Sequence, residues 1–592
     1  DFGETGTYGE WKPIKYSGSY GTNGFYLPFK QDYTVEGFST VTWAGNTTDQ
    51  YIGGVGFNPD LVWIKHRNGA GDHMLMDSIR GVTKNLLSNT TAAEETRAEG
   101  LQAFNTDGFY LGTNDGNLNR TARTYVGWNW DMSNPASNVG NTAIQFDNSD
   151  DSIDFELGTA LGTGNFTIEY WTYIDSLQNY DTLFSTTRGS TGFNVGTDAD
   201  GKAVWYRGSR LLESASGTYV VGNWYHTAYV RNGTTLKVYV NGVEKDSTTD
   251  SNNYSELTSS IGSLDSAGEF GGIKLDAFRI SNVARYTSNN FESPQARFTS
   301  DSNTLCLINS PTNVGGTIVD SSSANLSLSL TGTSVDASSV GKPAYPNTDG
   351  SITSLVRANT AYGQSIVKYT GTAGVSNATK IGHGLSAAPE MIIIRDYNNV
   401  QYWPVWHKDM HSDGGFDRKM YLNDSGAVSG TDQRRVTSVS STTFGLPEGA
   451  SSGGYSESNH IGEEHIAYVF HSVSGYSKFS SYTGDGTHDG SKAITLGFSP
   501  AFVMIKCIND TENWFIYDST RSPLGTPFLG GRRLAANSTD NELVGGSTGS
   551  DLITFTATGF KMTGSGGGSN GNNNTYVYMA FADKREYAYW LD

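Results

Sequence analysis

Apolar and β-branched residues occur along the chain in short runs, separated by clusters of Gly, Ser, Thr and Asn. Short runs bounded by turn residues are typical of strands, because amphipathic helices need an apolar stripe with a period near 3.6 residues. One run, Val55–Arg67 (VGFNPDLVWIKHR), has a Pro-containing turn followed by an apolar strand that ends in charge. The pattern recurs at Gly384–Tyr397 (GLSAAPEMIIIRDY) and Leu496–Ile508 (LGFSPAFVMIKCI), which indicates an internal repeat.

Other landmarks recur in the same order around this strand. Copies one and three share an Asp-Ser-x-Arg turn, at Asp77–Arg80 and Asp518–Arg521, which copy two lacks. All three copies close on a similar strand: RTYVGWNWDM, EHIAYVFHSV and NTYVYMAFAD. We therefore predict three related β-sandwich modules, at 37–132, 364–473 and 474–592, and expect the last two to pack as a rigid pair because almost no linker separates them.

Within the first copy the pattern predicts both strands and one helix. The acidic segment Ala92–Leu101 (AAEETRAEGL) is the one plausible helix. The predicted strands are Phe38–Trp43, Leu61–His66, Met74–Asp77, Phe109–Leu111 and Thr124–Trp130.

Residues 141–307 follow a different pattern. Strict alternation at Leu236–Asn241 (LKVYVN) is followed by Asn-Gly, a strong hairpin signal. The order IEYWTYID, GNWYHTAYVRNGTTLKVYVNG, LDAFRISNVARY resembles the laminin-G-like, concanavalin-A-like jelly roll, in which a Trp near Trp224 and a Val-Asn-Gly hairpin are usual. The resemblance implies two packed antiparallel sheets. We assign Trp171 and Trp224 to the core.

The remaining segments are predicted to be accessory. Residues 1–36, rich in Tyr, Gly and Pro, predict an irregular or two-stranded attachment segment whose aromatic side chains dock elsewhere. Residues 308–363, rich in Ser, Thr, Gly and Asn, predict a connector. The fold class is therefore all-β and multidomain, with one laminin-G-like jelly-roll sandwich and three β-sandwich repeats.

Charge and composition restrict the partners. The formal net charge of −20 argues against nucleic acid, because phosphate binding needs clustered Lys and Arg. No apolar run approaches the roughly 20 residues of a membrane span, so membrane insertion is not expected. The two cysteines, Cys306 and Cys507, lie in different modules and predict no disulfide. The sequence begins at Asp1 rather than Met, so we expect the natural N-terminus to be processed or to lie upstream.

Calcium is the one cofactor for which the sequence offers ligands. Asp198 and Asp200 precede Gly201, and alternating oxygen donors before Gly occur in calcium loops. Asp265 in GSLDSAGEFGG is a weaker candidate of the same kind. The alternative interpretation is a hairpin turn, because strand residues follow at once and no Glu stands at the distance of the last EF-hand ligand.

Candidate catalytic groups are few. Asp154 and Glu156 could share one strand face, as a glycosidase pair requires, but they lack a third acidic residue and an aromatic surround. His407 and His411 have the i, i+4 spacing of helical metal ligands, but their sequence context predicts strand and loop. Exposed Tyr and Trp could stack on sugars, and the sequence does not decide between that role and the core for Trp205, Trp403, Trp406 and Trp514. We assign no catalytic residue, predict that the protein is not an enzyme, and leave its ligand-binding residues unassigned.

The repeats also carry a resemblance. The leader SGSYGTNGFYLPF, the GF-x-PD strand, the Asp-Ser-x-Arg-Gly turn and the YVGWNW close together resemble virion proteins of marine tailed phages, which often hold a laminin-G-like module between such repeats. The resemblance implies a structural protein of the virion surface, most simply a tail-fibre or appendage adhesin. Its laminin-G-like module would bind a host-surface glycan or protein, and its other partners would be virion proteins. Covering of exposed strand edges favours a homo-oligomer, with a homotrimer as the simplest closed arrangement. The alternatives are a capsid decoration or fibre protein, a surface polysaccharide-degrading enzyme, and a cellular adhesin.

Overall fold

A computed structural model describes most of the chain. The described residues are 3–5, 11–13, 37–105, 107–113, 115–133, 139–140, 142–179, 181–186, 192–264, 272–291, 293–294, 296–311, 314–337, 343–374, 378–411, 415–430, 435–451, 456–523, 531–545 and 550–582. In this part of the chain strands dominate, and the one α-helix is α1 (Ser456–Asn459). The all-β prediction is confirmed.

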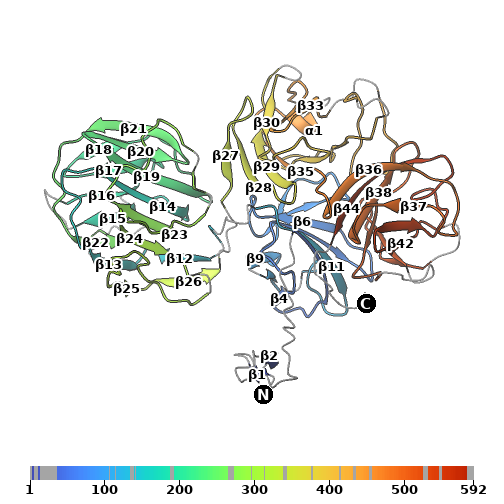
Figure 1. The fold of residues 1–592 in the computed structure, drawn as a ribbon, viewed down its shortest axis with the longest axis horizontal. Helices are drawn as coiled ribbons and strands as arrows, with labels where there is room; N and C mark the ends of the chain where they lie inside the picture. Colours follow the sequence, from blue (N-terminus) through green and yellow to red (C-terminus); the bar gives the residue numbers. More distant parts are fainter. Residues whose placement is uncertain are drawn as a thin grey trace, which may run out of the picture.

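Three repeat units form one body, which lies beside the laminin-G-like module (Figure 1). Unit 1 comprises β3 (Phe38–Ala44), β4 (Gln50–Gly53), β5 (Leu61–His66), β6 (His73–Asp77), β7 (Lys84–Leu87), β8 (Glu95–Thr96), β9 (Leu101–Asn105), β10 (Gly108–Leu111) and β11 (Thr124–Trp130). Unit 2 comprises β27 (Tyr345–Asn347), β28 (Ser354–Asn359), β29 (Gln364–Thr370), β30 (Lys380–Gly382), β31 (Met391–Asp396), β32 (Val405–His407), β33 (Ser438–Val439), β34 (Thr443–Gly445), α1 and β35 (Glu464–Phe470). Unit 3 comprises β36 (Ser477–Thr483), β37 (Ala493–Thr495), β38 (Pro500–Cys507), β39 (Phe515–Asp518), β40 (Arg532–Ala535), β41 (Leu543–Val544), β42 (Ile553–Thr556), β43 (Gly559–Met562) and β44 (Thr575–Ala582).

The units share one topology. Each has a six-stranded sheet that contains the same four-strand order: β3-β11-β5-β6, β29-β35-β31-β32 and β36-β44-β38-β39. Each also has a three-stranded sheet: β4-β10-β9, β30-β34-β33 and β37-β43-β42. The five strands predicted for the first copy are confirmed, and so is the repeat.

The recurring strand of each unit is buried on both faces. In β5, Val62 and Ile64 belong to the core of unit 1 itself. Leu61 and Trp63 instead join a large core shared with units 2 and 3. A strand covered on both sides is expected to be apolar throughout rather than alternating, which explains why β5 reads LVWI. All three units, and not only units 2 and 3, therefore pack as one body.

A ring of contacts links the units through the charged end of this strand. Lys65, Arg395 and Lys506 occupy equivalent positions, opposite Val126, Ile466 and Val577 of the closing strands. Lys65 Nζ donates to the carbonyl of Thr539 in unit 3 at 3.2 Å, and Lys506 Nζ donates to that of Ser425 in unit 2 at 3.0 Å. Arg395 closes the ring by donating to the Thr91 carbonyl in unit 1 at 2.8 Å. The residue at this position varies between Lys and Arg, but it is a cation in all three units.

The Asp-Ser-x-Arg turns lie at the same interfaces. Tyr468 of unit 2 donates its hydroxyl to Asp77 Oδ2 of unit 1 at 2.9 Å. Trp128 of unit 1 donates its indole N–H to Asp518 Oδ2 of unit 3 at 3.0 Å. At the remaining interface, His407 of unit 2 faces the carbonyl of Tyr578 in unit 3. The next residue, Met579, occupies the position of Trp128 and Tyr468, and its side chain has no N–H or O–H to donate. Unit 2 therefore has His407 in place of the turn Asp, and unit 3, which packs against it, has no side-chain donor at the matching position.

The inserted module is a two-sheet sandwich. Its strands are β12 (Thr142–Asp147), β13 (Ser152–Glu156), β14 (Phe166–Ile174), β15 (Asp181–Thr186), β16 (Asn194–Thr197), β17 (Ala203–Tyr206), β18 (Arg210–Glu213), β19 (Trp224–Asn232), β20 (Thr235–Val240), β21 (Val243–Thr249), β22 (Thr258–Ile261), β23 (Gly272–Ser281), β24 (Thr304–Asn309), β25 (Ser329–Thr331) and β26 (Ser334–Ala337). One sheet has the order β21-β20-β19-β14-β23-β12-β26, with β24 beside β23. The other has the order β18-β17-β16-β15-β22-β13-β25. The two antiparallel sheets predicted from the resemblance are confirmed.

The segment 308–363 contributes strands to its neighbours. β25 and β26 join the two sheets of the laminin-G-like module, and β27 and β28 extend the large sheet of unit 2. The composition predicts a connector, but β25, β26 and β27 are edge strands of these sheets, and β28 lies between β27 and β29. At the other end of the chain, β1 (Gly3–Thr5) and β2 (Trp11–Pro13) form an antiparallel pair, as predicted for 1–36. The aromatic-rich residues 14–36 of that segment lie outside the described residues.

The helix predicted at Ala92–Leu101 is wrong. That segment holds the short strand β8, and β9 begins at Leu101. A helix of about ten residues is marginal without tertiary support. Here Glu94 instead pairs with Arg80 at 3.0 Å, and Arg97 pairs with Asp115 at 3.1 Å. Cys306 and Cys507 are buried and free, and no helix of the described residues is long and apolar enough to cross a membrane.

Candidate functional site

The calcium loop predicted from Asp198 and Asp200 is a hairpin turn between β16 and β17. Asp198 is buried, and its Oδ1 accepts the backbone N–H groups of Asp200 and Lys202, each at 3.1 Å. Its Oδ2 lies 2.8 Å from Arg210. Asp200 is exposed, with Gly201 at φ 67° completing the turn. Asp265, the third candidate, lies outside the described residues.

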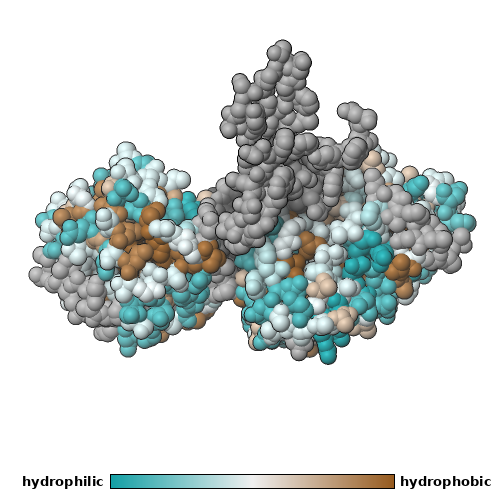
Figure 2. Space-filling model, turned by 90° about the horizontal axis from the view of Figure 1, so that it is seen from below, coloured by the Kyte–Doolittle hydropathy of each residue, from teal (hydrophilic) through white to brown (hydrophobic). Residues whose placement is uncertain are grey.

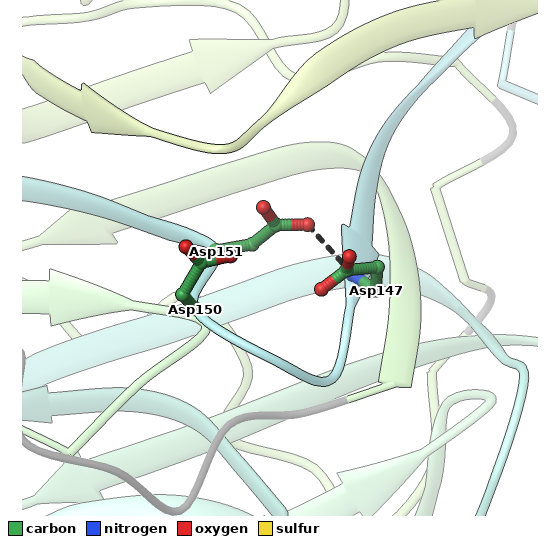
Figure 3. A group of neighbouring side chains, drawn as sticks. All are labelled: Asp147, Asp150 and Asp151. Carbon is green, nitrogen blue, oxygen red and sulfur yellow. Dashed lines mark hydrogen bonds between the residues drawn. The ribbon is translucent and has the colours of Figure 1, made fainter.

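The structure brings a different acidic group together. Asp147, Asp150 and Asp151 each offer a carboxylate oxygen, and these oxygens lie within 4.8 Å of one another (Figure 3). Asp151 is buried, and its Oδ2 accepts the N–H of Asp147 at 2.6 Å. Burial, opposed by that hydrogen bond, raises the pKa of Asp151, and the charges of Asp147 and Asp150 raise it further. Oxygen ligands of this kind suit a hard cation such as Ca²⁺, so these are residues that could hold one.

Asp154 and Glu156, the pair considered for glycosidase activity, lie on β13, which is hydrogen-bonded to β22 and β25. Asp154 and Glu156 do share the outer face of β13, because Ile153 and Phe155 point into the core. Asp154 stands between Ser260 and Ser329 of the neighbouring strands, and Glu156 is exposed. Neither has the aromatic surround that a sugar-cleaving site would need.

Glu169, which lies on β14 of the larger sheet of the module, is fully buried. Its Oε1 accepts from Arg279 Nε at 2.9 Å, and its Oε2 accepts from the Tyr286 hydroxyl at 2.7 Å. Burial disfavours the charged form, but the hydrogen bond with His226 and the charge of Arg279 outweigh it, so the pKa of Glu169 lies below its ordinary value. Glu169 therefore holds the sheet to the covering segment that carries Tyr286.

His407 and His411 do not form a shared metal site. His407 ends β32, and both ring nitrogens have partners: Nε2 faces the Tyr578 carbonyl at 3.3 Å, and Nδ1 accepts the N–H of Asp409 at 3.1 Å. His411 pairs with Asp417 at 3.1 Å.

The six tryptophans weighed from the sequence as core or sugar-stacking residues are all buried. Trp171 and Trp224 are buried, as predicted, in a small cluster at the edge of the module. The four tryptophans that the sequence left open are also buried: Trp205, Trp403, Trp406 and Trp514. They are not sugar-stacking platforms in this arrangement.

An open groove of about 490 Å³ lies over the end of the hairpin formed by β19 and β20. Its walls are Asn232, Thr235 and Lys237 from the two strands, and Tyr286 and Thr287 from the segment that covers the sheet. The Tyr286 ring stacks on Phe291 with centroids 3.7 Å apart and also lines the groove. The groove thus combines an aromatic ring with amide, hydroxyl and ammonium groups.

The electrostatics of the groove are close to neutral. Lys237 Nζ donates to Glu244 at 2.8 Å and to Asn289 at 3.1 Å, and the bond to Glu244 raises the pKa of Lys237. Burial and the Glu169 charge raise the pKa of Tyr286, so its hydroxyl stays protonated. Sequence reasoning missed this groove, because Tyr286 is brought to β19 and β20 only by tertiary packing. The RNGTT turn between these strands was its one local signal.

Comparison with protein families now places the repeats. A family described as a domain of unknown function, DUF7483, matches residues 34–165 and 276–585, more than half of the chain. The chain belongs to the DUF7483 family. The residues matched by the DUF7483 model include all three units, which share a core. A second family, the concanavalin A-like lectin/glucanase superfamily, matches residues 147–289, which lie within the inserted module.

Solved structures similar to this DUF7483 protein are distant. A carbohydrate-binding protein from Bacteroides ovatus, described as putative, is 12% identical, covers 51% of this chain and 93% of its own, and has a TM-score of 0.29. A SAP-like pentraxin from Limulus polyphemus is 13% identical, with 33% and 98% covered and a TM-score of 0.24. Domains LG4-5 of the mouse laminin α1 chain are 11% identical, with 45% and 93% covered and a TM-score of 0.21. No curated protein sequence matches the chain.

Proposed function

We propose that the protein binds glycans through its laminin-G-like module, at the groove over β19 and β20. The observation that carries this proposal is the groove itself, in which the Tyr286 ring lies beside Asn232, Thr235 and Lys237. Sugars have apolar faces that stack on aromatic rings, and hydroxyl groups that hydrogen-bond to amides and hydroxyls. The match of the module to a lectin and glucanase superfamily supports the same class of ligand.

We propose that the protein binds glycans without cleaving them. A retaining glycosidase needs two carboxylates about 5–5.5 Å apart on either side of the scissile bond. Glu169 already accepts hydrogen bonds from Arg279 and Tyr286, and Asp154 and Glu156 lie away from the groove beside Tyr286, on the other sheet. Reducing-sugar release from algal and bacterial polysaccharides tests this. Release that disappears in the Asp154→Asn, Glu156→Gln double variant would establish the enzyme instead.

The groove is tested by a glycan array with the full chain. We expect Thr235→Trp, which fills the groove from an exposed position, to weaken binding by about tenfold or more, equivalent to about 1.4 kcal/mol. Thr258→Trp is the matched control, because it places the same bulk on an exposed position of the other sheet. If Thr235→Trp and Thr258→Trp bind glycans equally well, the groove is not the binding site.

We propose the surface of a phage virion as the setting, with a tail fibre or appendage as the position. The resemblance of the repeats supports this setting, and a rigid three-unit body suits a scaffold that presents a binding module. Immunogold labelling of purified particles tests it: label at the tail supports the adhesin, label over the head supports a capsid decoration, and unlabelled particles would exclude both.

A further inference from the structure

The module meets the body through an aromatic contact. Tyr345 of β27, a strand of unit 2, packs edge-to-face on Trp171 of β14 with ring centroids 5.7 Å apart. Both belong to a small buried cluster that also holds Trp224 and Phe298. The two parts of the chain therefore share a packed interface rather than only a tether.

A pocket of about 550 Å³, open to solvent, lies at this junction. The module contributes Asn223, Trp224 and Asn241 to its lining. Unit 1 contributes Ile79 and unit 2 contributes Leu355 and Lys368. Ile79 is the variable residue of the Asp-Ser-x-Arg turn, Trp224 is the Trp of the laminin-G-like pattern, and Asn241 belongs to its Val-Asn-Gly hairpin. Motifs from both parts of the chain thus converge on one cavity.

The two amides supply opposite hydrogen-bonding groups. Asn241 stands at φ 51°, and its Oδ1 accepts the N–H of His226 at 3.0 Å. Asn223 Nδ2 donates to the carbonyls of Val220 and Val221, each at 3.3 Å. Among the described residues, Asn241 Nδ2 has no acceptor and Asn223 Oδ1 has no donor, so one donor and one acceptor remain for a ligand.

Beside the two amides, the lining includes apolar side chains and one paired lysine. Ile79 and Leu355 are half-buried side chains on the body side of the pocket. Lys368 is paired with Glu464, so it does not offer an uncompensated positive charge. A pocket lined mainly by polar groups, with an amide donor and an amide acceptor among them, suits an uncharged polyhydroxyl group. Interfaces between domains are preferred places for ligand pockets.

We propose that this junction pocket is a second saccharide site, which takes one neutral sugar unit between the module and the body. It is separate from the groove. Trp224 begins β19 and Asn232 ends it, and the nine residues of that strand place the two sites roughly 26 Å apart. The choice of a saccharide rests on the proposed function, whereas the position of the site rests on the junction alone. A sugar bound here contacts both parts, so its binding fixes the module on the body.

The test combines binding with hydrogen exchange on the full chain. The probes are free glucose, galactose, mannose and N-acetylglucosamine, each titrated against the wild type and three variants. Ile79→Trp fills the pocket from the body, without changing the module. Asn241→Gly keeps the positive φ but removes the amide. Thr235→Trp blocks only the groove. Circular dichroism checks that each variant is folded.

We expect one of these sugars to bind the Thr235→Trp variant, and both Ile79→Trp and Asn241→Gly to weaken that binding by about tenfold. The bound sugar should slow exchange on both sides of the junction, around Asn223–Trp224 and around Leu355. Binding that Thr235→Trp alone abolishes would overturn the junction site and leave the proposed function intact. If only Ile79→Trp and Asn241→Gly lose binding, the junction site is supported and the groove is excluded as a binding site. If no sugar binds the wild type, both proposals are wrong.

Discussion

The indole N–H of Trp128 donates to Asp518 Oδ2 over 3.0 Å, although 390 residues separate the two. Both side chains are fully buried, and Asp518 also pairs with Arg521 of its own turn. The equivalent bond at the next interface joins Tyr468 to Asp77 at 2.9 Å. At the third interface, Met579 stands in place of the donor and His407 in place of the Asp. Each unit thus holds the group that matches its neighbour, which makes the order of the three units specific.

Removing one donor should weaken the body measurably. We expect Tyr468→Phe to lower the free energy of unfolding by about 1.5–3 kcal/mol, because it leaves a buried carboxylate with one hydrogen bond fewer. Met579→Leu is the matched control at the equivalent position, and should cost less than about 1.5 kcal/mol because it conserves volume and breaks no polar contact. Urea denaturation measures both. A Tyr468→Phe cost no larger than that of Met579→Leu would contradict the role given to the bond.

The interface lysines should make stability rise in mild alkali. Burial lowers the pKa of Lys65 and of Lys506 to about 8, against an ordinary value of 10.5. Between these values the unfolded chain binds more protons than the folded protein, so the free energy of unfolding increases with pH. Urea denaturation at several values from about pH 8 to about pH 10 should show this slope. It should be smaller in Lys65→Met and unchanged in Lys245→Met, whose side chain is exposed.

Buried histidines should cause a loss of stability in mild acid. Burial lowers the pKa of both His383 and His407 to about 4, against an ordinary 6.5. In each ring Nδ1 accepts a backbone N–H, from Leu385 and Asp409 respectively, so protonation breaks that bond. The unfolded chain takes up protons first, and stability should therefore fall as pH drops from about 6.5 to about 4. His407→Gln should flatten the fall, whereas the exposed His488→Gln should not.

The hairpin turn at Asp198 can be separated from a calcium site. We expect Asp198→Ala to cost about 1–2 kcal/mol, because two backbone N–H groups lose their acceptor, and Asp200→Ala to cost little at its exposed position. Thermal unfolding with calcium or with a chelator shows which acidic residues bind the ion. A calcium-dependent midpoint that Asp198→Ala removes supports the predicted loop. One that Asp151→Ala removes places the ion at the Asp147–Asp151 group.

The sequence predicts much of the fold because local patterns carry it. Leu61–His66 and Thr124–Trp130 were predicted to the residue, since each is a continuous apolar run between turn signals. The helix predicted at Ala92–Leu101 does not form. Glu94 and Arg97 instead form ion pairs outside the segment, with Arg80 and Asp115. The closed arrangement of units is likewise invisible in the sequence. Lys65 looks like the variable end of a strand until Thr539 is seen opposite it.

The candidate sites were harder to predict for the same reason. The acidic residues that sequence spacing singles out, Asp198 and Asp154, serve a turn and an outer strand face. The groove depends on Tyr286 reaching β20, and the junction pocket depends on Ile79 facing Trp224. Neither contact has a spacing rule. What the sequence did provide was the landmarks themselves, since Trp224, Asn241 and the Asp-Ser-x-Arg turn all border the junction pocket.

A body built from a single chain would also set the valency of the proposed attachment. A trimer of identical chains would carry one laminin-G-like module on each chain, and so three in all. Here one chain supplies all three units but only one module, inserted between units 1 and 2. In the proposed adhesin, each body would therefore engage a surface through one module. Firm adhesion to a cell would then require many bodies side by side, with avidity set by their spacing rather than by the affinity of any one module.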